Sequence, residues 1–118
     1  MTERRVLVVD DDRGVREALV VLLEWEGYAV EAAPDGPTAL RLVAVRPPDL
    51  VISAVSRPRL DGVELLARIR ADHPSQPVLL LSAAFRGPLP EGVDFVAKPF
   101  DVDHLLAAVE RLLDRLPE

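Results

Sequence analysis

The chain has 118 residues, of which 20 are acidic and 14 basic, so its formal net charge is −6. A chain of this length forms one domain, residues 1–118, and its 49% hydrophobic content is enough for a buried core. The absence of cysteine excludes disulfides, thiolate metal sites and thiol nucleophiles. The acidic balance argues against nucleic-acid binding by this domain itself. The sequence contains neither a membrane span nor a secretory signal, so we expect a cytoplasmic protein.

Short apolar runs alternate along the chain with longer stretches of helical spacing. In residues 15–25 the apolar side chains of Val15, Leu19 and Leu22 recur on one helical face, and Gly27 supplies the stop. We expect Trp25 to cover the end of this first helix. Strands that alternate with helices predict right-handed βαβ units and a parallel sheet covered on both faces. The predicted strands are residues 6–9, 28–32, 50–55, 78–81 and 93–97, and the predicted helices are residues 15–25, 36–45, 63–71 and 102–116.

The crossover between the last two predicted strands is unusually short. Residues 83–92 include Gly87, Pro88, Pro90 and Gly92. A stable helix usually needs more residues and fewer helix breakers. We therefore expect a loop or a single irregular turn here, in place of a full helix.

Residues that carry chemistry gather at the carboxyl ends of the predicted strands, where open parallel sheets bind ligands. Asp10, Asp11 and Asp12 follow the first strand, Ser82 follows the fourth, and Lys98, the only lysine, follows the fifth. Carboxylates suit Mg²⁺, and a hydroxyl with an ammonium suits a phosphoryl group. Asp12 is better explained as a helix N-cap. For Asp10 and Asp11 the site explanation is favoured, because both lie at the ligand-binding edge.

Five motifs occur in order and span essentially the whole chain. They are Val8-Val9-Asp10-Asp11, Pro48-Asp49-Leu50-Val51-Ile52, Pro58 with Asp61-Gly62, Leu81-Ser82-Ala83 and Val96-Ala97-Lys98-Pro99-Phe100. Together they resemble the receiver domain of two-component response regulators. This resemblance implies a flavodoxin-like, doubly wound α/β fold of five parallel strands in the order 2-1-3-4-5, here with a shortened or missing fourth helix. It also implies an aspartate, at the end of the third strand, that accepts a phosphoryl group from a histidine kinase.

The resemblance assigns a role to each matching residue. Asp10 and Asp11 are the acidic pair that holds Mg²⁺, with the backbone carbonyl of Ser56 as a further contact. The hydroxyl and the ammonium that meet the phosphoryl group belong to Ser82 and Lys98. The aromatic residue that changes rotamer is Phe95, which we expect to be part core and part surface.

The acceptor position departs from the family pattern, because the motifs place it at Ala54. A methyl group is neither a nucleophile nor a metal ligand. Asp49 lies five residues earlier, roughly 16 Å along a strand, and Ser53 should face the other side of the sheet. We therefore expect no catalytic residue, no cofactor, and at most weak Mg²⁺ binding. Without a phosphoryl group to meet, Lys98 should pair with Asp10 or Asp11.

These observations favour a pseudo-receiver that is not an enzyme and acts by protein contact, as a docking partner or a homodimer, without aspartyl phosphorylation. Its histidine kinase partner is not identified by the sequence. The alternative is an Mg²⁺-dependent phosphorelay receiver with an engineered Asp-to-Ala change at position 54. The shortened crossover favours natural divergence, because an engineered change would not explain it. A small flavodoxin-like cofactor binder is disfavoured, because the acids after the first strand would repel an anion.

Overall fold

The structure, a computed structural model, describes residues 3–53, 62–82, 89–97 and 99–115, except for the side chains of residues 62, 63 and 82. Strands and helices alternate through most of this part of the chain. The elements in chain order are β1 (Arg5–Val9), α1 (Arg13–Trp25), β2 (Ala29–Ala33), α2 (Gly36–Val45), β3 (Leu50–Ser53), α3 (Gly62–Asp72), β4 (Val78–Ser82), β5 (Val93–Ala97) and α4 (Val102–Asp114).

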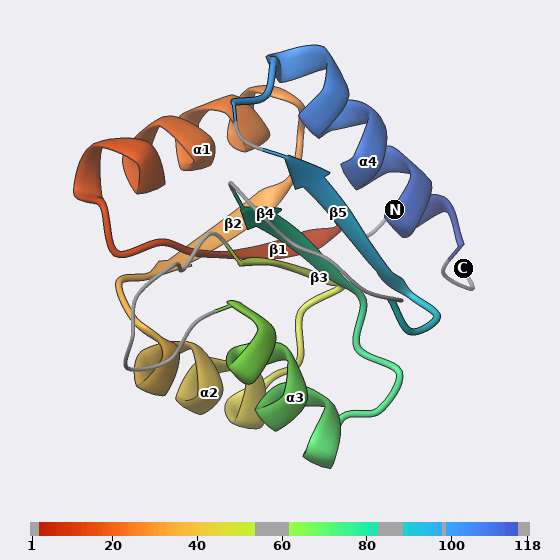
Figure 1. The fold of residues 1–118 in the computed structure, drawn as a ribbon. Helices are drawn as coiled ribbons and strands as arrows, with labels where there is room; N and C mark the ends of the chain where they lie inside the picture. The colour runs from red at the N-terminus through yellow and green to blue at the C-terminus, as the bar shows by residue number, and fades with distance from the viewer. Residues whose placement is uncertain (1–2, 54–61, 83–88, 98, 116–118) are drawn as a thin grey trace.

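The five strands form one parallel sheet in the order β2-β1-β3-β4-β5 (Figure 1). Helices α1 and α4 cover one face of the sheet, and α2 and α3 cover the other. This arrangement confirms the predicted doubly wound α/β fold and its strand order. It also brings the carboxyl ends of all five strands to one edge.

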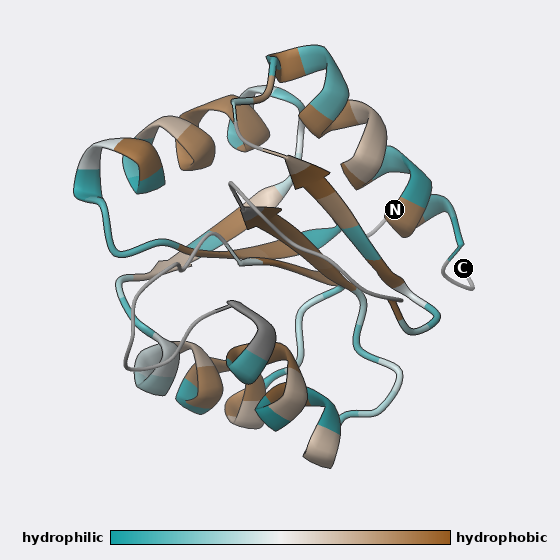
Figure 2. Ribbon diagram, viewed as in Figure 1, coloured by the Kyte–Doolittle hydropathy of each residue, from teal (hydrophilic) through white to brown (hydrophobic). Residues whose placement is uncertain are grey.

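The central strands are apolar on both faces because helices cover both faces (Figure 2). Successive side chains of a strand point to opposite sides of a sheet. Accordingly, Val8 and Ile52 join the core cluster under α1 and α4. Val9 and Val51 join the cluster on the side of α2 and α3. All four are fully buried, which explains why β1 and β3 appear in the sequence as unbroken hydrophobic runs.

Three helices begin with an aspartate whose side chain accepts a hydrogen bond from a backbone N–H of the first turn. These N-caps are Asp12 of α1, Asp35 of α2 and Asp101 of α4. Such a cap satisfies a donor that the helix itself leaves without a partner. At the other end of α1, Gly27 adopts a φ of 97°, the left-handed conformation that glycine tolerates best. Across the described part of the chain, no helix has the length and apolar character that a membrane crossing requires.

The prediction that Trp25 covers the end of the first helix is wrong, because its side chain is 85% exposed. Leu23 is fully buried, and a residue two positions further along a helix points roughly 200° away. Trp25 therefore faces solvent.

Residues 89–92 of the last crossover contain no helix, as predicted. Residues 83–88 lie outside the described residues, so the form of the whole crossover stays a prediction.

An ion pair joins β5 to α4. The Asp94 carboxylate accepts hydrogen bonds of 2.8 Å from Nη2 of Arg111 and from the backbone N–H of Phe95. Burial disfavours the charged carboxylate. The two hydrogen bonds and the charges of Arg111 and Arg115 outweigh burial, and together they hold the pKa of Asp94 below its ordinary value of 3.8.

A folded-state pKa below the unfolded one means that ionised Asp94 stabilises the fold above pH 3.8. This contribution is lost as the pH falls through the lower, folded-state value. We expect Asp94→Asn to lower the free energy of unfolding at pH 7 by at most about 1 kcal/mol, because the pair is partly exposed. The difference in free energy of unfolding between Asp94→Asn and the unchanged protein should shrink as the pH falls below 3.8. Urea unfolding at stepped pH measures it, and a difference that stays constant with pH would contradict the electrostatic explanation.

Candidate functional site

The site is built on the loop that leaves β1. Asp10 follows the strand directly and is only 2% exposed. Its Oδ1 accepts a hydrogen bond of 2.8 Å from the backbone N–H of Asp12. Its backbone carbonyl accepts one of 2.8 Å from Nη1 of Arg16, and its N–H donates to the carbonyl of Ala33. Hydrogen bonds with α1 and β2 therefore fix the backbone of Asp10, directly after the end of β1.

The three consecutive acids have different surroundings. Asp10 is buried, Asp11 is half-buried, and Asp12 is exposed. Oδ1 of Asp12 accepts a hydrogen bond of 3.0 Å from the N–H of Val15, which confirms its predicted role as the N-cap of α1. All three carboxylates lie at the amino-terminal end of α1, where the helix dipole favours negative charge.

Strand β3 ends beside these acids. Its last residue, Ser53, is the register partner of Val9, the residue before Asp10. Ser53 is 2% exposed, and its hydroxyl has no hydrogen-bond partner among the described residues. The chain therefore leaves β3 next to Asp10, as the sequence predicted.

The remaining predicted site residues are only partly described. Phe95 lies in the middle of β5 opposite Leu80 of β4. It is half-buried and packs against the core cluster on the side of α2 and α3, so the predicted mixture of core and surface is confirmed. Ser82 ends β4 at the same edge of the sheet as Asp10, but its side chain is not described. Ala54, Ser56 and Lys98 lie outside the described residues, so their roles and the predicted pairing of Lys98 stay predictions.

The described residues do not by themselves form a tight Mg²⁺ site. The described part of the chain contains no group of three His, Cys, Asp or Glu side chains that could hold a metal ion. One oxygen of Asp10 already accepts the N–H of Asp12. Mg²⁺ prefers near-octahedral oxygen ligands, and two adjacent carboxylates supply few of them.

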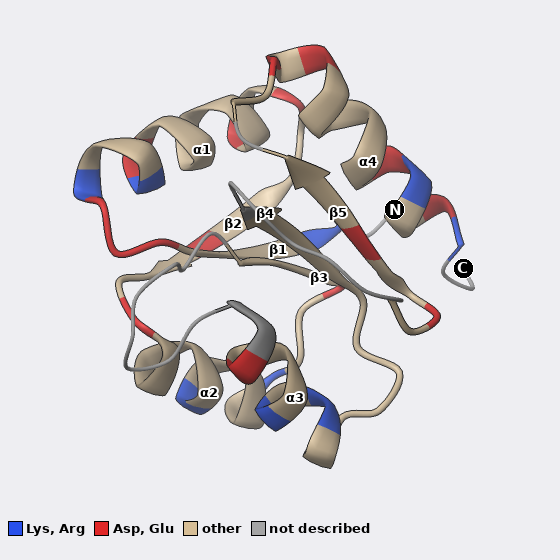
Figure 3. Cartoon of the chain, viewed as in Figure 1, with Lys and Arg blue, Asp and Glu red and all other residues tan. Residues whose placement is uncertain are grey.

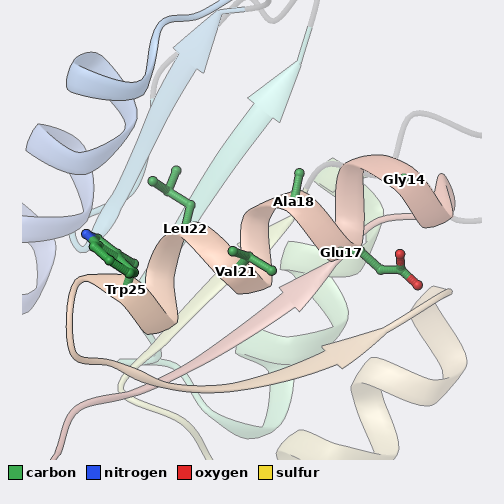
Figure 4. Close-up of a pocket in the computed structure, with 6 residues that line it drawn as sticks. All are labelled: Gly14, Glu17, Ala18, Val21, Leu22 and Trp25. Atoms are coloured by element: carbon green, nitrogen blue, oxygen red, sulfur yellow. The ribbon is translucent and has the colours of Figure 1, made fainter.

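A second surface, which the sequence analysis did not find, lies on α1 (Figure 4). Gly14, Ala18, Val21, Leu22 and Trp25 line a shallow hollow of about 600 Å³ together with a carboxylate from the same helix. Val21 is 65% exposed and Trp25 85%. Residues 14, 18, 21 and 25 follow helical spacing, so a search for a second apolar stripe would have found this surface. Exposed apolar patches of this kind mark interaction sites.

A doubly wound parallel sheet with buried and half-buried acids after its first strand is the architecture of a receiver-type signalling domain. The family model of the response regulator receiver domain matches residues 6–110, and the chain belongs to this family. Such domains are generally signalling domains, which interact with histidine kinases and other proteins in two-component pathways. This finding confirms the resemblance drawn from the sequence motifs.

Individual relatives agree with the family match. Response regulator MprA of Mycobacterium sp. (strain KMS) is 44% identical over 119 aligned residues, which cover 94% of this chain and 51% of that protein. The chain thus spans about half the length of the curated relatives it matches. The structure of chemotaxis protein CheY4 from Vibrio cholerae has a TM-score of 0.82 at 28% identity, over 95% of this chain and all of that one. The receiver domain of the hybrid histidine kinase CckA has a TM-score of 0.79 at 35% identity, over 92% and 98%.

The role of Asp12 is testable by a matched pair of substitutions. Asp12→Ala removes the acceptor of the Val15 N–H, and we expect it to lower the free energy of unfolding by about 1 kcal/mol. Asp12→Asn keeps an acceptor oxygen and should stay within about 0.5 kcal/mol of the unchanged protein. Urea unfolding measures both variants. A larger effect of Asp12→Ala on Mg²⁺ affinity than on stability would instead identify Asp12 as a metal ligand.

Proposed function

We propose that this receiver domain signals without phosphorylation of an aspartate. The observation that carries the proposal is Ala54, which the family motifs align with the phosphoryl acceptor. It follows Ser53, the residue that ends β3 beside the acidic loop. A methyl group has no oxygen that can attack a phosphorus atom, so the chain lacks the family's nucleophile.

The neighbours of Ala54 on β3 do not replace it. The hydroxyl of Ser53 is buried, which keeps a phosphodonor away from it. Asp49 comes before β3, at the opposite end of the strand, and its Oδ2 accepts a hydrogen bond of 2.8 Å from the backbone N–H of Arg5. Both side chains are therefore unsuitable as substitute acceptors.

Signalling by protein contact is supported by the apolar hollow on α1. This helix begins three residues after Asp10, so a partner that lies over α1 also lies beside the acidic edge. The occupant we propose is a histidine kinase of a two-component pathway, with apolar side chains at the contact. In this proposal the domain works in the cytoplasm, Mg²⁺ binds weakly through Asp10 and Asp11, and Lys98 pairs with one of these acids.

If position 54 lacks the acceptor carboxylate, the chain should not become phosphorylated. After incubation with acetyl phosphate and Mg²⁺, we expect intact-mass spectrometry to show no phosphoryl adduct on the unchanged chain. Ala54→Asp restores a carboxylate nucleophile at the aligned position and should produce a single acid-stable, base-labile adduct. Ala54→Asn, which has nearly the same shape but no nucleophile, is the matched control and should remain unmodified.

Two outcomes would overturn the proposal. An adduct on the unchanged chain would show that another residue accepts the phosphoryl group. Saturable backbone NMR shifts at Asp10, Asp11 and Phe95 on titration with beryllofluoride, beyond those that the same Mg²⁺ concentration produces alone, would show that the pocket still binds a phosphoryl-like ligand, which would favour a ligand sensor.

The proposed contact over α1 can be followed through Trp25, the single tryptophan of the chain. Its indole is 85% exposed, so docking of a partner should remove water from it and shift its emission to shorter wavelength. The experiment titrates the chain with a purified histidine kinase and follows fluorescence. Val21→Asp, in the middle of the hollow, should weaken binding, whereas Val45→Asp on α2, at a site that is more exposed still (84% against 65%), should not. Equal loss in both variants, or binding without an emission change, would place the contact elsewhere.

A further inference from the structure

A second hollow lies at the edge of the sheet opposite the acidic loop. It has a volume of about 330 Å³, which falls at the lower end of the range of about 300–1,000 Å³ typical of small-molecule sites. Its walls come from the last turns of α3 and α4 and from the segments that enter β4 and β5. Figure 3 shows basic residues at the carboxyl ends of both helices.

One wall of this hollow is Arg70, and its guanidinium is held in place by the fold. Its Nε and Nη2 donate hydrogen bonds of 3.1 and 2.8 Å to the backbone carbonyl of Gln76. Gln76 is 5% exposed, and its Nε2 donates to the carbonyls of Pro48 and Pro77. The side chain of Gln76 thus fixes the segment before β4 to the segment before β3. The carbonyl of the same residue orients the guanidinium of Arg70.

This orientation leaves donors of Arg70 available. A guanidinium carries five N–H groups, and the contacts with Gln76 among the described residues use two of its three nitrogens. Burial lowers the pKa of Arg70 below its ordinary value, and the negative charge of Glu91 opposes this effect. The group nevertheless stays cationic at neutral pH. A partly desolvated cation with free N–H groups at the wall of a hollow is a suitable donor for an oxyanion.

The backbone at Gly92 lies so close to the guanidinium of Arg70 that a side chain does not fit between them. Gly92 has a φ of 81°, and a Cβ built on it would lie 2.8 Å from Nη2 of Arg70. Any other residue here would push the guanidinium out of position. Glycine therefore allows the strand entrance to lie directly against the cation.

A second cation completes the arrangement. Arg115 caps the carboxyl end of α4 and lines the same hollow. No side-chain hydrogen bond or ion pair of Arg115 occurs within the described residues. The lining carries two arginines and one acid, Glu91, so it is net positive in a chain whose net charge is −6. The helix dipole also favours cations at these helix ends, which is the purely structural explanation that an experiment must separate from binding.

We propose that this hollow is a binding site for a small anion bearing a carboxylate or phosphate group, held between the guanidinium groups of Arg70 and Arg115. The proposal is independent of the function proposed above, because it concerns the opposite edge of the sheet. Leu112 would supply the apolar floor, since it lines the hollow and is 1% exposed.

The test is a titration of the chain with inorganic phosphate and, separately, with succinate, each against sodium chloride at matched ionic strength. Backbone NMR shifts of Gly92 and Ser75 report on the hollow. We expect saturable shifts with at least one of the two anions, and the anion that saturates identifies the preferred chemistry. Shifts that match those in chloride, or that never saturate, would mean an adventitious ion only and would overturn the proposal.

Two arginine variants separate binding from helix capping. Arg115→Ala should lower the affinity for the anion about tenfold, as expected for the loss of a charge-assisted hydrogen bond. Arg46 is the C-cap residue of α2 and does not line the hollow, so Arg46→Ala removes a charge from another helix end; it is the control and should leave the affinity unchanged. Equal weakening by both variants would show that only the overall charge matters, and would overturn the assignment of the site.

Discussion

The need to cover a parallel sheet on both faces is the constraint on which the rest of this structure depends. β1 and β3 lie in the middle of the sheet, and side chains of β3 such as Val51 and Ile52 pack into two separate cores. Each crossover helix must present an apolar stripe to one of these cores. The connections that result place all carboxyl strand ends at one edge and all amino ends at the other, so the molecule has two chemically distinct edges.

The carboxyl edge is negatively charged and tightly held. Asp10 is buried there with its carboxylate and carbonyl both hydrogen-bonded, and such satisfaction is what makes a buried polar group tolerable. The function proposed above assigns the position of the phosphoryl acceptor at this edge to Ala54. On that proposal the same framework signals by contact with other proteins, and the exposed apolar side of α1 is the surface that we propose for it.

The amino edge has the opposite character. The backbone carbonyl of Gln76, the only glutamine of the chain, accepts hydrogen bonds from Arg70 there. Gly92 leaves the space that the guanidinium of Arg70 occupies. The hydrogen bonds of this half-buried cation to the Gln76 carbonyl tie the last turn of α3 to the segment that enters β4. Arg70 also lines a hollow at this edge, where we propose an anion site.

Much of the fold could be predicted from the sequence, because it depends on local signals. The alternation of apolar runs and helical spacing predicted every described strand and helix to within about two residues, and Asp12 was identified as a cap. The proposed assignment of Ala54 to the acceptor position likewise rests on the sequence alone. Only the tertiary structure decided which of three adjacent acids is buried, which side of α1 Trp25 occupies, and that Arg70, Gly92 and Arg115 share one hollow. The physical reason is that these features depend on where whole helices rest against the sheet, through contacts between residues far apart in the chain, and no local pattern encodes those distances.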